Sequence, residues 1–253
     1  MPSTVQPSQA YPAYFIGHAG VGLLFNESSN NKTVQDNLRY IGKEILSLSP
    51  RPKALIVFSG HFEAGEIHGP GVIEVYEYDW PHHDAPDLAV QVWSHLVKAG
   101  IKAKRVERGV DHGVWVPFKV MFPEETPLDI PVVQVSTFHG YDLASQIRLG
   151  EVVGALRHEG YVILGSGMAV HSFASIDEIR SALSEEKREA TSAKVLAESR
   201  AFDTHLREAV TKRAAKERRE GLLKLTELYE FKRSHPTVET AIYRHDDTVE
   251  SLM

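Results

Sequence analysis

Short apolar runs alternate with longer amphipathic segments along this chain, a pattern typical of strands and helices in alternation. The runs with strand character are AYFIG, ALIVF, PVVQVS and YVIL, over residues 13–17, 54–58, 131–136 and 161–164, with residues 72–75 as a further candidate. The helical patterns cover residues 33–48, 87–99 and 184–228, the last with an apolar stripe of Phe202, Leu206 and Val210. This order predicts a single α/β domain with a central, mixed but mostly parallel sheet flanked by helices.

No boundary divides the chain into two units. Residues 1–11 are polar and contain Pro and Ser, so we expect a flexible N-terminal arm there. The rest of the chain, residues 12–253, shows no internal repeat and no low-complexity tract. We therefore expect these residues to form one domain, which carries the function.

Composition and charge exclude several classes of protein. The 253-residue chain has a formal net charge of −6, which argues against nucleic-acid binding. It contains no cysteine, which excludes disulfides, thiolate metal sites and cysteine nucleophiles and fits a reducing compartment. Its start lacks the pattern of a signal peptide, and no apolar stretch approaches the roughly 20 residues that span a bilayer. We therefore expect a cytoplasmic protein without nucleic-acid or membrane partners.

Four histidines lie beside small residues at the ends of apolar segments. His18 follows FIG, His61 follows VFSG, and His171 follows ILGSGMAV, so these three share a strand-like run, then glycine or serine, then histidine. His112 lies in the segment GVDHGVWVPF. Strand ends at one edge of an α/β sheet open onto the usual ligand crevice. The histidines can therefore converge on one site.

Converging imidazoles suit two kinds of chemistry. Neutral histidine is the commonest protein ligand for metals, and its ordinary pKa of about 6.5 also suits a general acid or base. The spacing of these histidines matches no short zinc motif such as HExxH, so a metal site and a proton-transfer site both stay open. Taken singly, a histidine at a strand end is more often a polar loop residue than a ligand. The repeated context favours a shared site.

The ordered set of histidine segments resembles the class III extradiol ring-cleavage dioxygenases of the DOPA 4,5-dioxygenase (LigB-like) family. The most specific pieces are DHGVWVP at residues 111–117, GSG at 165–167 followed by His171, and HPTVE at 235–239. The resemblance runs from about Pro12 to Glu239. It implies an α/β enzyme with a mononuclear non-haem metal, which opens a catechol ring next to the diol with O₂.

The resemblance also implies roles for the four histidines. His18 and His61 would be metal ligands, and His171 a further ligand or the base that takes a catechol proton. His112 would face the substrate or O₂ as hydrogen-bond donor and acid. The implied metal is Fe(II), which suits sites with histidine and open positions, and Zn²⁺ also occupies such sites. Asp111 has a simpler interpretation as a turn or helix cap, and Trp115 as wall or core.

The sequence departs from the family near its C-terminus. The HPTxE stretch is normally followed at once by a histidine, the third metal ligand, and here that position is Thr240. Glu239 could turn inward to complete a site with two histidines and one carboxylate, although this needs a local backbone change. His235 or His245 could substitute instead, or the site could be incomplete. The first motif also differs, since GHAG stands where the family usually has Ser-His-Gly.

Three functions follow from these observations. The first is an Fe(II)-dependent extradiol dioxygenase that acts on a catechol such as DOPA or a smaller aromatic diol. The second is a non-catalytic metal- or peptide-binding protein on the same scaffold, which Thr240 motivates. The third is a zinc hydrolase, since histidine sites bind Zn²⁺ and activate water, although no carboxylate stands in a recognisable general-base motif.

Overall fold

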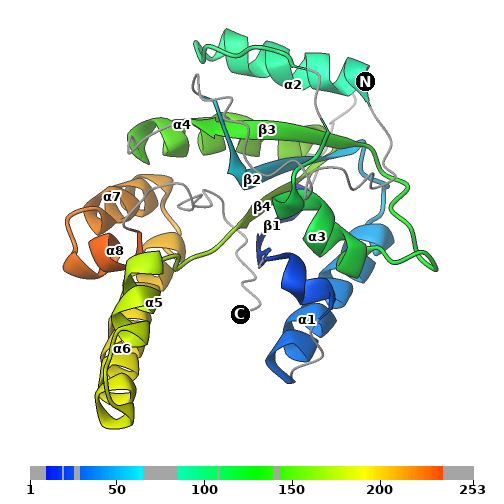
Figure 1. The fold of residues 1–253 in the computed structure, drawn as a ribbon. Helices are drawn as coiled ribbons and strands as arrows, with labels where there is room; N and C mark the ends of the chain where they lie inside the picture. The colour runs from blue at the N-terminus through cyan, green and yellow to red at the C-terminus, as the bar shows by residue number, and fades with distance from the viewer. Residues whose placement is uncertain are drawn as a thin grey trace, which may run out of the picture.

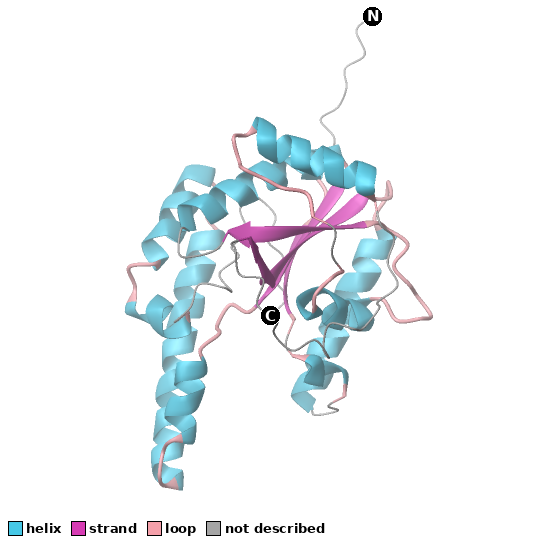
Figure 2. Ribbon diagram, turned by 45° about the horizontal axis from the view of Figure 1, so that its top comes forward, coloured by secondary structure: helices cyan, strands magenta, loops and turns pink. Residues whose placement is uncertain are grey.

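A parallel β-sheet forms the centre of the structure, and helices cover both of its faces (Figures 1 and 2). The computed structural model describes residues 10–18, 20–25, 29–64, 85–106, 109–138 and 143–235. The strands are β1 (Ala13–Gly17), β2 (Ala54–Ala64), β3 (Val132–Phe138) and β4 (Tyr161–Gly167). The α-helices are α1 (Ser29–Ser47), α2 (Pro86–Lys98), α3 (His112–Met121), α4 (Leu143–Gly154), α5 (Phe173–Arg180), α6 (Glu185–Val210), α7 (Ala215–Leu225) and α8 (Tyr229–Ser234). Short 3₁₀ turns lie at Val21–Leu24 and Ala155–Glu159.

The strands lie in the order β1-β4-β2-β3, and every pairing between the described strands is parallel. Parallel neighbours need long crossover connections, which the intervening helices supply. The chain passes from β1 through β2 to β3 and then returns, so that β4 lies between β1 and β2. All four strands therefore end at the same edge of the sheet, and the segments that follow them begin there.

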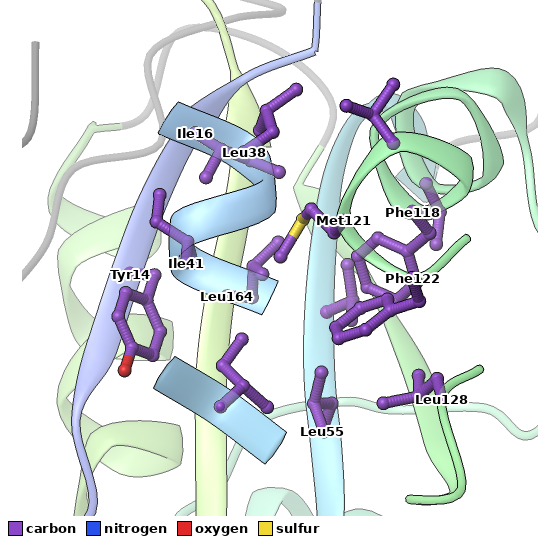
Figure 3. Close-up of a cluster of buried hydrophobic side chains, with 14 of the residues drawn as sticks. Tyr14, Ile16, Leu38, Ile41, Leu55, Phe118, Met121, Phe122, Leu128 and Leu164 are labelled. Carbon is purple, nitrogen blue, oxygen red and sulfur yellow. The ribbon is translucent and has the colours of Figure 1, made fainter. Parts of the chain in front are cut away.

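Side chains of β2 alternate between two hydrophobic cores because successive residues of a strand point to opposite faces. Leu55 and Val57 belong to the core that α1 and α3 cover, and Figure 3 shows Leu55 and Leu164 of the sheet beside side chains of both helices. Ile56 and Phe58 belong to the opposite core, which α2 and α4 cover. Both faces of the sheet are therefore buried, which explains the continuous apolar run of this strand.

A third core joins α4 to the C-terminal helices α6, α7 and α8. Phe202 of α6 is fully buried in it, and Leu206 and Val210 pack against the same cluster. The apolar stripe predicted on this segment is therefore confirmed. Helices α5 and α6 lie side by side and extend away from the sheet (Figure 1).

The predicted fold class is confirmed as a single α/β domain, and the described strand pairings are parallel rather than mixed. Each of the four strands begins within one residue of its predicted start, and β2 continues to Ala64, well beyond its predicted end. The sequence did not predict helices α3, α4, α5 and α8, and the first two cover opposite faces of the sheet. Helix α3 lacks a polar face because nearly all of its residues are buried. It therefore shows no amphipathic period.

Some expectations fall on parts of the chain outside the described ranges. The strand expected at residues 72–75 and most of the expected arm, residues 1–9, lie there. Tyr11, at the end of that arm, donates its backbone N–H to the Arg157 carbonyl oxygen at 3.1 Å. The flexible arm and the single unit from residue 12 to 253 stay predictions. No helix within the described ranges is long and apolar enough to cross a membrane.

Gly42 of α1 packs against the backbone of α3 and leaves no room for a side chain. A Cβ atom at this position would lie 2.2 Å from the Met121 carbonyl oxygen. We expect Gly42→Ala to lower the free energy of unfolding by about 1–3 kcal/mol, the usual cost of overpacking, despite the roughly 1 kcal/mol that Ala gains over Gly in a helix. Urea unfolding measures the change. Gly22→Ala is the control, since a Cβ there meets nothing within 4 Å, and equal effects would contradict the packing explanation.

Candidate active site

Three histidine rings meet at the carboxyl edge of the sheet. His18 directly follows β1, His61 lies near the end of β2, and His112 is the first residue of α3. The ring centroids of His61 and His112 are 4.0 Å apart, and those of His18 and His61 are 4.7 Å apart. The centroids of His18 and His112 are 6.1 Å apart. We call these three residues the histidine cluster, and the expected convergence is observed for them.

An irregularity in β2 determines where His61 lies. The register between β2 and β3 is regular up to Phe58 and resumes only at Glu63, with a shift between them. The extra residues of β2 bulge out of the ladder, and such bulges re-aim side chains beside functional sites. The sequence predicted His61 beyond the end of the strand. In the structure, His61 lies within this bulge of β2. Its backbone N–H donates to Ser59 Oγ at 3.1 Å.

The protonation of the His18 ring follows from its neighbour Ser166. The Ser166 hydroxyl donates its one proton to the Gly113 carbonyl oxygen, so its oxygen can only accept from His18. His18 Nδ1 lies 3.2 Å from that oxygen and therefore carries the ring proton when the imidazole is neutral. The other nitrogen, Nε2, keeps its lone pair and lies 2.9 Å from Nε2 of His61. His18 is thus held in the tautomer that binds a metal through Nε2.

Asp111 fixes the start of α3 and with it the position of His112. The Asp111 side chain accepts a hydrogen bond from the backbone N–H of Gly113, which makes it the N-cap of the helix. The interpretation of Asp111 as a cap is therefore confirmed. Trp115, one turn further on, is only 4% exposed and belongs to the core under α3, as expected.

Removal from water keeps the histidine cluster neutral, although to different extents, since His18 is buried, His112 is half-buried and His61 is exposed. It lowers the pKa of both His18 and His61 from 6.5 to about 4, and the charge of His112 adds to the effect because like charges repel. Burial also lowers the pKa of His112. The Asp111 carboxylate acts in the opposite direction on all three pKa values but does not outweigh burial. Near pH 7 the site therefore presents neutral imidazoles, the form that binds metals and accepts protons.

His18 and His61 are spaced as two ligands of one metal ion would be. Two nitrogen ligands at about 2.1 Å from a metal and at right angles to each other are about 3 Å apart, and the two Nε2 atoms are separated by 2.9 Å. The contact between His18 Nδ1 and Ser166 is of the kind that orients metal-binding histidines. Among the described residues, no group of three His, Cys, Asp or Glu side chains could hold a metal ion. Within the described ranges, the structure thus brings together two imidazoles at the spacing that one metal ion would need.

His171 lies on the segment that follows β4. Its backbone N–H donates to the Ser234 carbonyl oxygen at 2.9 Å, and its ring lies edge-on to Phe173 with centroids 4.7 Å apart. A positive charge on His171 lowers the pKa of His18 and His61, so its ring is close enough to influence both. The described residues do not include a three-ligand group with His171. Its role as ligand or base stays a prediction.

Of the residues that could stand in for a histidine at position 240, one is described by the structure and the others are not. His235 is described and is 2% exposed, with its ring packed against Phe202 at 4.9 Å and Phe231 at 5.0 Å between centroids. Glu239, Thr240 and His245 lie outside the described ranges, so the structure says nothing of them.

Sequence reasoning missed the polar residues that support the histidine cluster, namely Ser59, Gln134 and Ser166. Ser59 lies two residues before His61, and a strand places such residues on the same face, which was an available signal. Gln134 interrupts an apolar strand that is buried on both faces, and a polar residue there needs a partner. Ser166 was noted only as part of a glycine-rich motif, and its contact with His18 depends on the pairing of β4 with β1.

Comparison with known proteins identifies similar sequences. A sequence model described as the catalytic LigB subunit of aromatic ring-opening dioxygenase matches residues 12–242. A 4,5-DOPA dioxygenase extradiol-like protein of Schizosaccharomyces pombe is 31% identical over 207 residues, which cover 70% of this chain and 67% of the relative. The 4,5-DOPA dioxygenase extradiol of Beta vulgaris is 30% identical over 174 residues, covering 62% of each chain. The dioxygenase tasH of Hapsidospora irregularis is 31% identical over 220 residues, which cover 79% of this chain and 66% of the relative.

The chain therefore spans roughly two thirds of the length of these relatives. Among solved structures, the crystal structure of an uncharacterized protein from Escherichia coli K12 has the same fold, with a TM-score of 0.64. The two are 23% identical, and the match covers 92% of this chain and 85% of the other. At this identity the similarity supports the fold alone.

The buried ring of His235 makes the stability of the fold depend on pH. Burial lowers the pKa of His235 from 6.5 to about 4. As the pH falls from about 6.5 to about 4, His235 binds a proton in the unfolded chain but stays neutral in the folded chain. The free energy of unfolding therefore decreases. Between pH 7.5 and 5 we expect the wild type to lose about 1–2 kcal/mol more unfolding free energy than His235→Phe.

Urea unfolding at several pH values tests this expectation. His205→Phe is the control for the loss of a different histidine, since His205 also lies in the C-terminal helices, on α6. If His235→Phe and the wild type lose stability equally over this pH range, the buried ring is not responsible.

Proposed function

The chain belongs to the LigB family of aromatic ring-opening dioxygenases, and we propose that it opens a catechol ring next to the diol with O₂ and a mononuclear metal. The observation that carries this proposal is the histidine cluster at the carboxyl edge of the sheet, with two Nε2 atoms 2.9 Å apart and a third ring beside them. The names of the relatives support a substrate of the DOPA type, and a smaller aromatic diol is the alternative.

His18 and His61 would hold the metal through their Nε2 atoms. The His18 tautomer set by Ser166 and the low pKa values of both rings favour this role, since protons do not compete for these nitrogens near pH 7. Iron(II) is the metal that we propose, because when bound it supplies a Lewis acid with open positions for both the diol and O₂. Zn²⁺ would bind the same imidazoles.

His112 would donate a hydrogen bond to the substrate or O₂ and act as the acid. Its ring lies 4.0 Å from that of His61, so a ligand at the His18–His61 pair is within its reach. Burial lowers its pKa, so a proton taken by this ring is readily released again. Its position at the first residue of α3 is also favourable, since a helix N-terminus stabilises the negative charge that develops on catechol oxygens.

His171 would take the proton of a catechol hydroxyl. The electrostatic influence of this ring on the pKa of both His18 and His61 supports the role. Removal of a hydroxyl proton near neutral pH needs a base of the strength of histidine.

Oxygen uptake tests the proposed reaction. The full chain is purified without oxygen, loaded with Fe(II) and mixed with a panel of catechols. We expect catechol-dependent O₂ uptake and a yellow ring-opened product. His112→Gln is expected to reduce kcat by about 10²–10⁴-fold, the usual contribution of general acid–base catalysis, with the metal content unchanged.

His95→Gln is the matched control, because His95 is a histidine of α2 that hydrogen-bonds to Glu159 away from the cluster. Wild-type protein that contains iron but shows no O₂ uptake on any catechol would contradict the proposal. Unchanged kcat in His112→Gln would contradict the role of that residue alone.

A second candidate function is a non-catalytic binding protein on the same scaffold. It is favoured by Thr240 in place of the usual third histidine, together with the lack of a three-ligand group among the described residues. Metal affinity of the wild type and of Thr240→His distinguishes the two functions. Tight binding by the wild type, with O₂ uptake, would support the enzyme. Weak binding that Thr240→His restores would support the second candidate.

A further inference from the structure

Asp111 is a carboxylate buried at 1% exposure beside the histidine cluster. Both of its oxygens are used. Oδ1 accepts from the Ser59 hydroxyl at 2.7 Å and from the Gly113 N–H at 2.8 Å, and Oδ2 accepts from Gln134 Nε2 at 2.6 Å. These donors come from β2, α3 and β3. One side chain therefore joins three elements at the edge of the sheet where the histidines lie.

A short path of hydrogen bonds runs from Asp111 to His61. The Ser59 hydroxyl donates to Asp111, which leaves its oxygen to accept the His61 backbone N–H at 3.1 Å. Ser59 itself is fully buried. This bond spans the bulge of β2, where the regular ladder with β3 is interrupted. Asp111 therefore supports the backbone of His61 at a point where the sheet does not.

A second path runs from Asp111 to His18. The Gly113 peptide unit is held by Asp111 at its N–H, and the Gly113 carbonyl oxygen accepts from the Ser166 hydroxyl. The Ser166 oxygen then accepts the proton on His18 Nδ1. The orientation and tautomer of the His18 ring thus depend on where the first turn of α3 lies. His112 lies between the first two members of this path, since it connects Asp111 to Gly113 in the chain.

The space around Asp111 is filled. A Cβ atom at Gly113 would lie 2.4 Å from Ser59 Oγ, 2.9 Å from Asp111 Oδ1 and 3.2 Å from His61 Cδ2. Glycine at this position thus lets the helix start approach both the carboxylate and the His61 ring. Added bulk at Gly113 would therefore displace Ser59, Asp111 or His61, which lie against it.

Asp111 makes more contacts than helix capping requires. Helices α5 and α6 are capped by Ser172 and Ser184, and each cap accepts one backbone N–H. Asp111 makes the equivalent contact to Gly113 and also binds two side chains from other elements. Its charge raises the pKa of every ring in the histidine cluster, against the effect of burial. A serine or asparagine cap would supply neither this charge nor the same set of acceptors.

We propose that Asp111 is a positioning residue for the histidine cluster, orienting His61 through Ser59 and His18 through the first turn of α3. The inference rests on the proposed function in that the cluster is taken as the metal site. It assigns to Asp111 no contact with the substrate or the metal. Its role is to hold the two Nε2 atoms at the separation that one metal ion requires.

Three variants of the full chain separate the two paths. Ser59→Ala removes the hydroxyl that links Asp111 to His61, and Ser166→Ala removes the hydroxyl that links Gly113 to His18. Asp111→Ala removes both paths. Histidine-ring ¹H–¹⁵N spectra of the metal-free protein report the environment and tautomer of each ring, and titration with Zn²⁺ reports the affinity of the pair.

We expect Ser59→Ala to shift the His61 signals more than those of His18, and Ser166→Ala to do the reverse. Asp111→Ala is expected to shift both and to weaken Zn²⁺ binding by about 10–100-fold, the usual effect of removing a residue that supports metal ligands. Unchanged ring signals and Zn²⁺ affinity in Ser59→Ala and Ser166→Ala would overturn the proposal, even if Asp111→Ala does not fold.

Asp111→Asn tests whether the hydrogen bonds or the charge matter more. Gln134 Oε1 is buried without a hydrogen-bond partner among the described residues, so the Gln134 amide can flip and accept from the new Asn amide. All three contacts can then re-form, and we expect the ring signals to stay close to those of the wild type, with most of the affinity for Zn²⁺ retained. Loss of affinity as large as in Asp111→Ala would overturn the positioning role.

Ser184→Ala, which removes the cap of α6 far from the cluster, is the matched control for cap loss alone. It is expected to lower stability without a change in the ring signals or in Zn²⁺ affinity. None of these measurements depends on ring opening. If the wild type shows no O₂ uptake but the ring signals and affinities respond as expected, the proposed function fails and the positioning role of Asp111 stands.

Discussion

Parallel pairing of the strands is the constraint on which the rest of this structure depends. Parallel neighbours need crossover helices, the helices bury both faces of the sheet, and all strands then end at one edge. That edge is where His18 and His61 lie, and α3 brings His112 to it from the side. Because both faces are filled by the two cores, polar chemistry has room only at the strand ends.

The site at this edge combines two opposing electrostatic effects. Burial lowers the pKa of each ring in the histidine cluster, and the Asp111 carboxylate raises it. Burial is the larger effect, so the rings are neutral near pH 7. The carboxylate itself can be buried because three donors satisfy its oxygens. The polar network therefore has two effects. It supports the histidine cluster, and its hydrogen bonds allow the charge of Asp111 to remain buried.

The chain belongs to the LigB family of aromatic ring-opening dioxygenases. Thr240 is the position near the C-terminus at which its sequence departs from the pattern of that family. Two imidazoles are spaced as ligands of one metal ion would be, and Thr240 stands at the position where the resemblance implies a histidine. His235, the first residue of the same stretch, packs against Phe202 and Phe231. It therefore contributes to the core of the C-terminal helices. Position 240 is thus where this chain departs from the sequence pattern that it otherwise follows.

The sequence by itself determined the class of fold, the four described strands and the residues of the histidine cluster. Strands buried on both faces read as continuous apolar runs, and histidines after such runs lie at the sheet edge whatever the details of packing. The cap role of Asp111 and the core role of Trp115 were also predictable, because capping and burial are largely local properties.

Only the tertiary structure decided how these residues meet. The bulge that holds His61 arises from pairing with β3, and the apolar helix α3 has no amphipathic period because it is buried nearly all round. The tautomer of His18 depends on Ser166, which is distant in the chain and is brought near by the pairing of β1 with β4. Hydrogen-bond partners from different strands are set by register and crossover, and these long-range properties leave no local signal in the sequence.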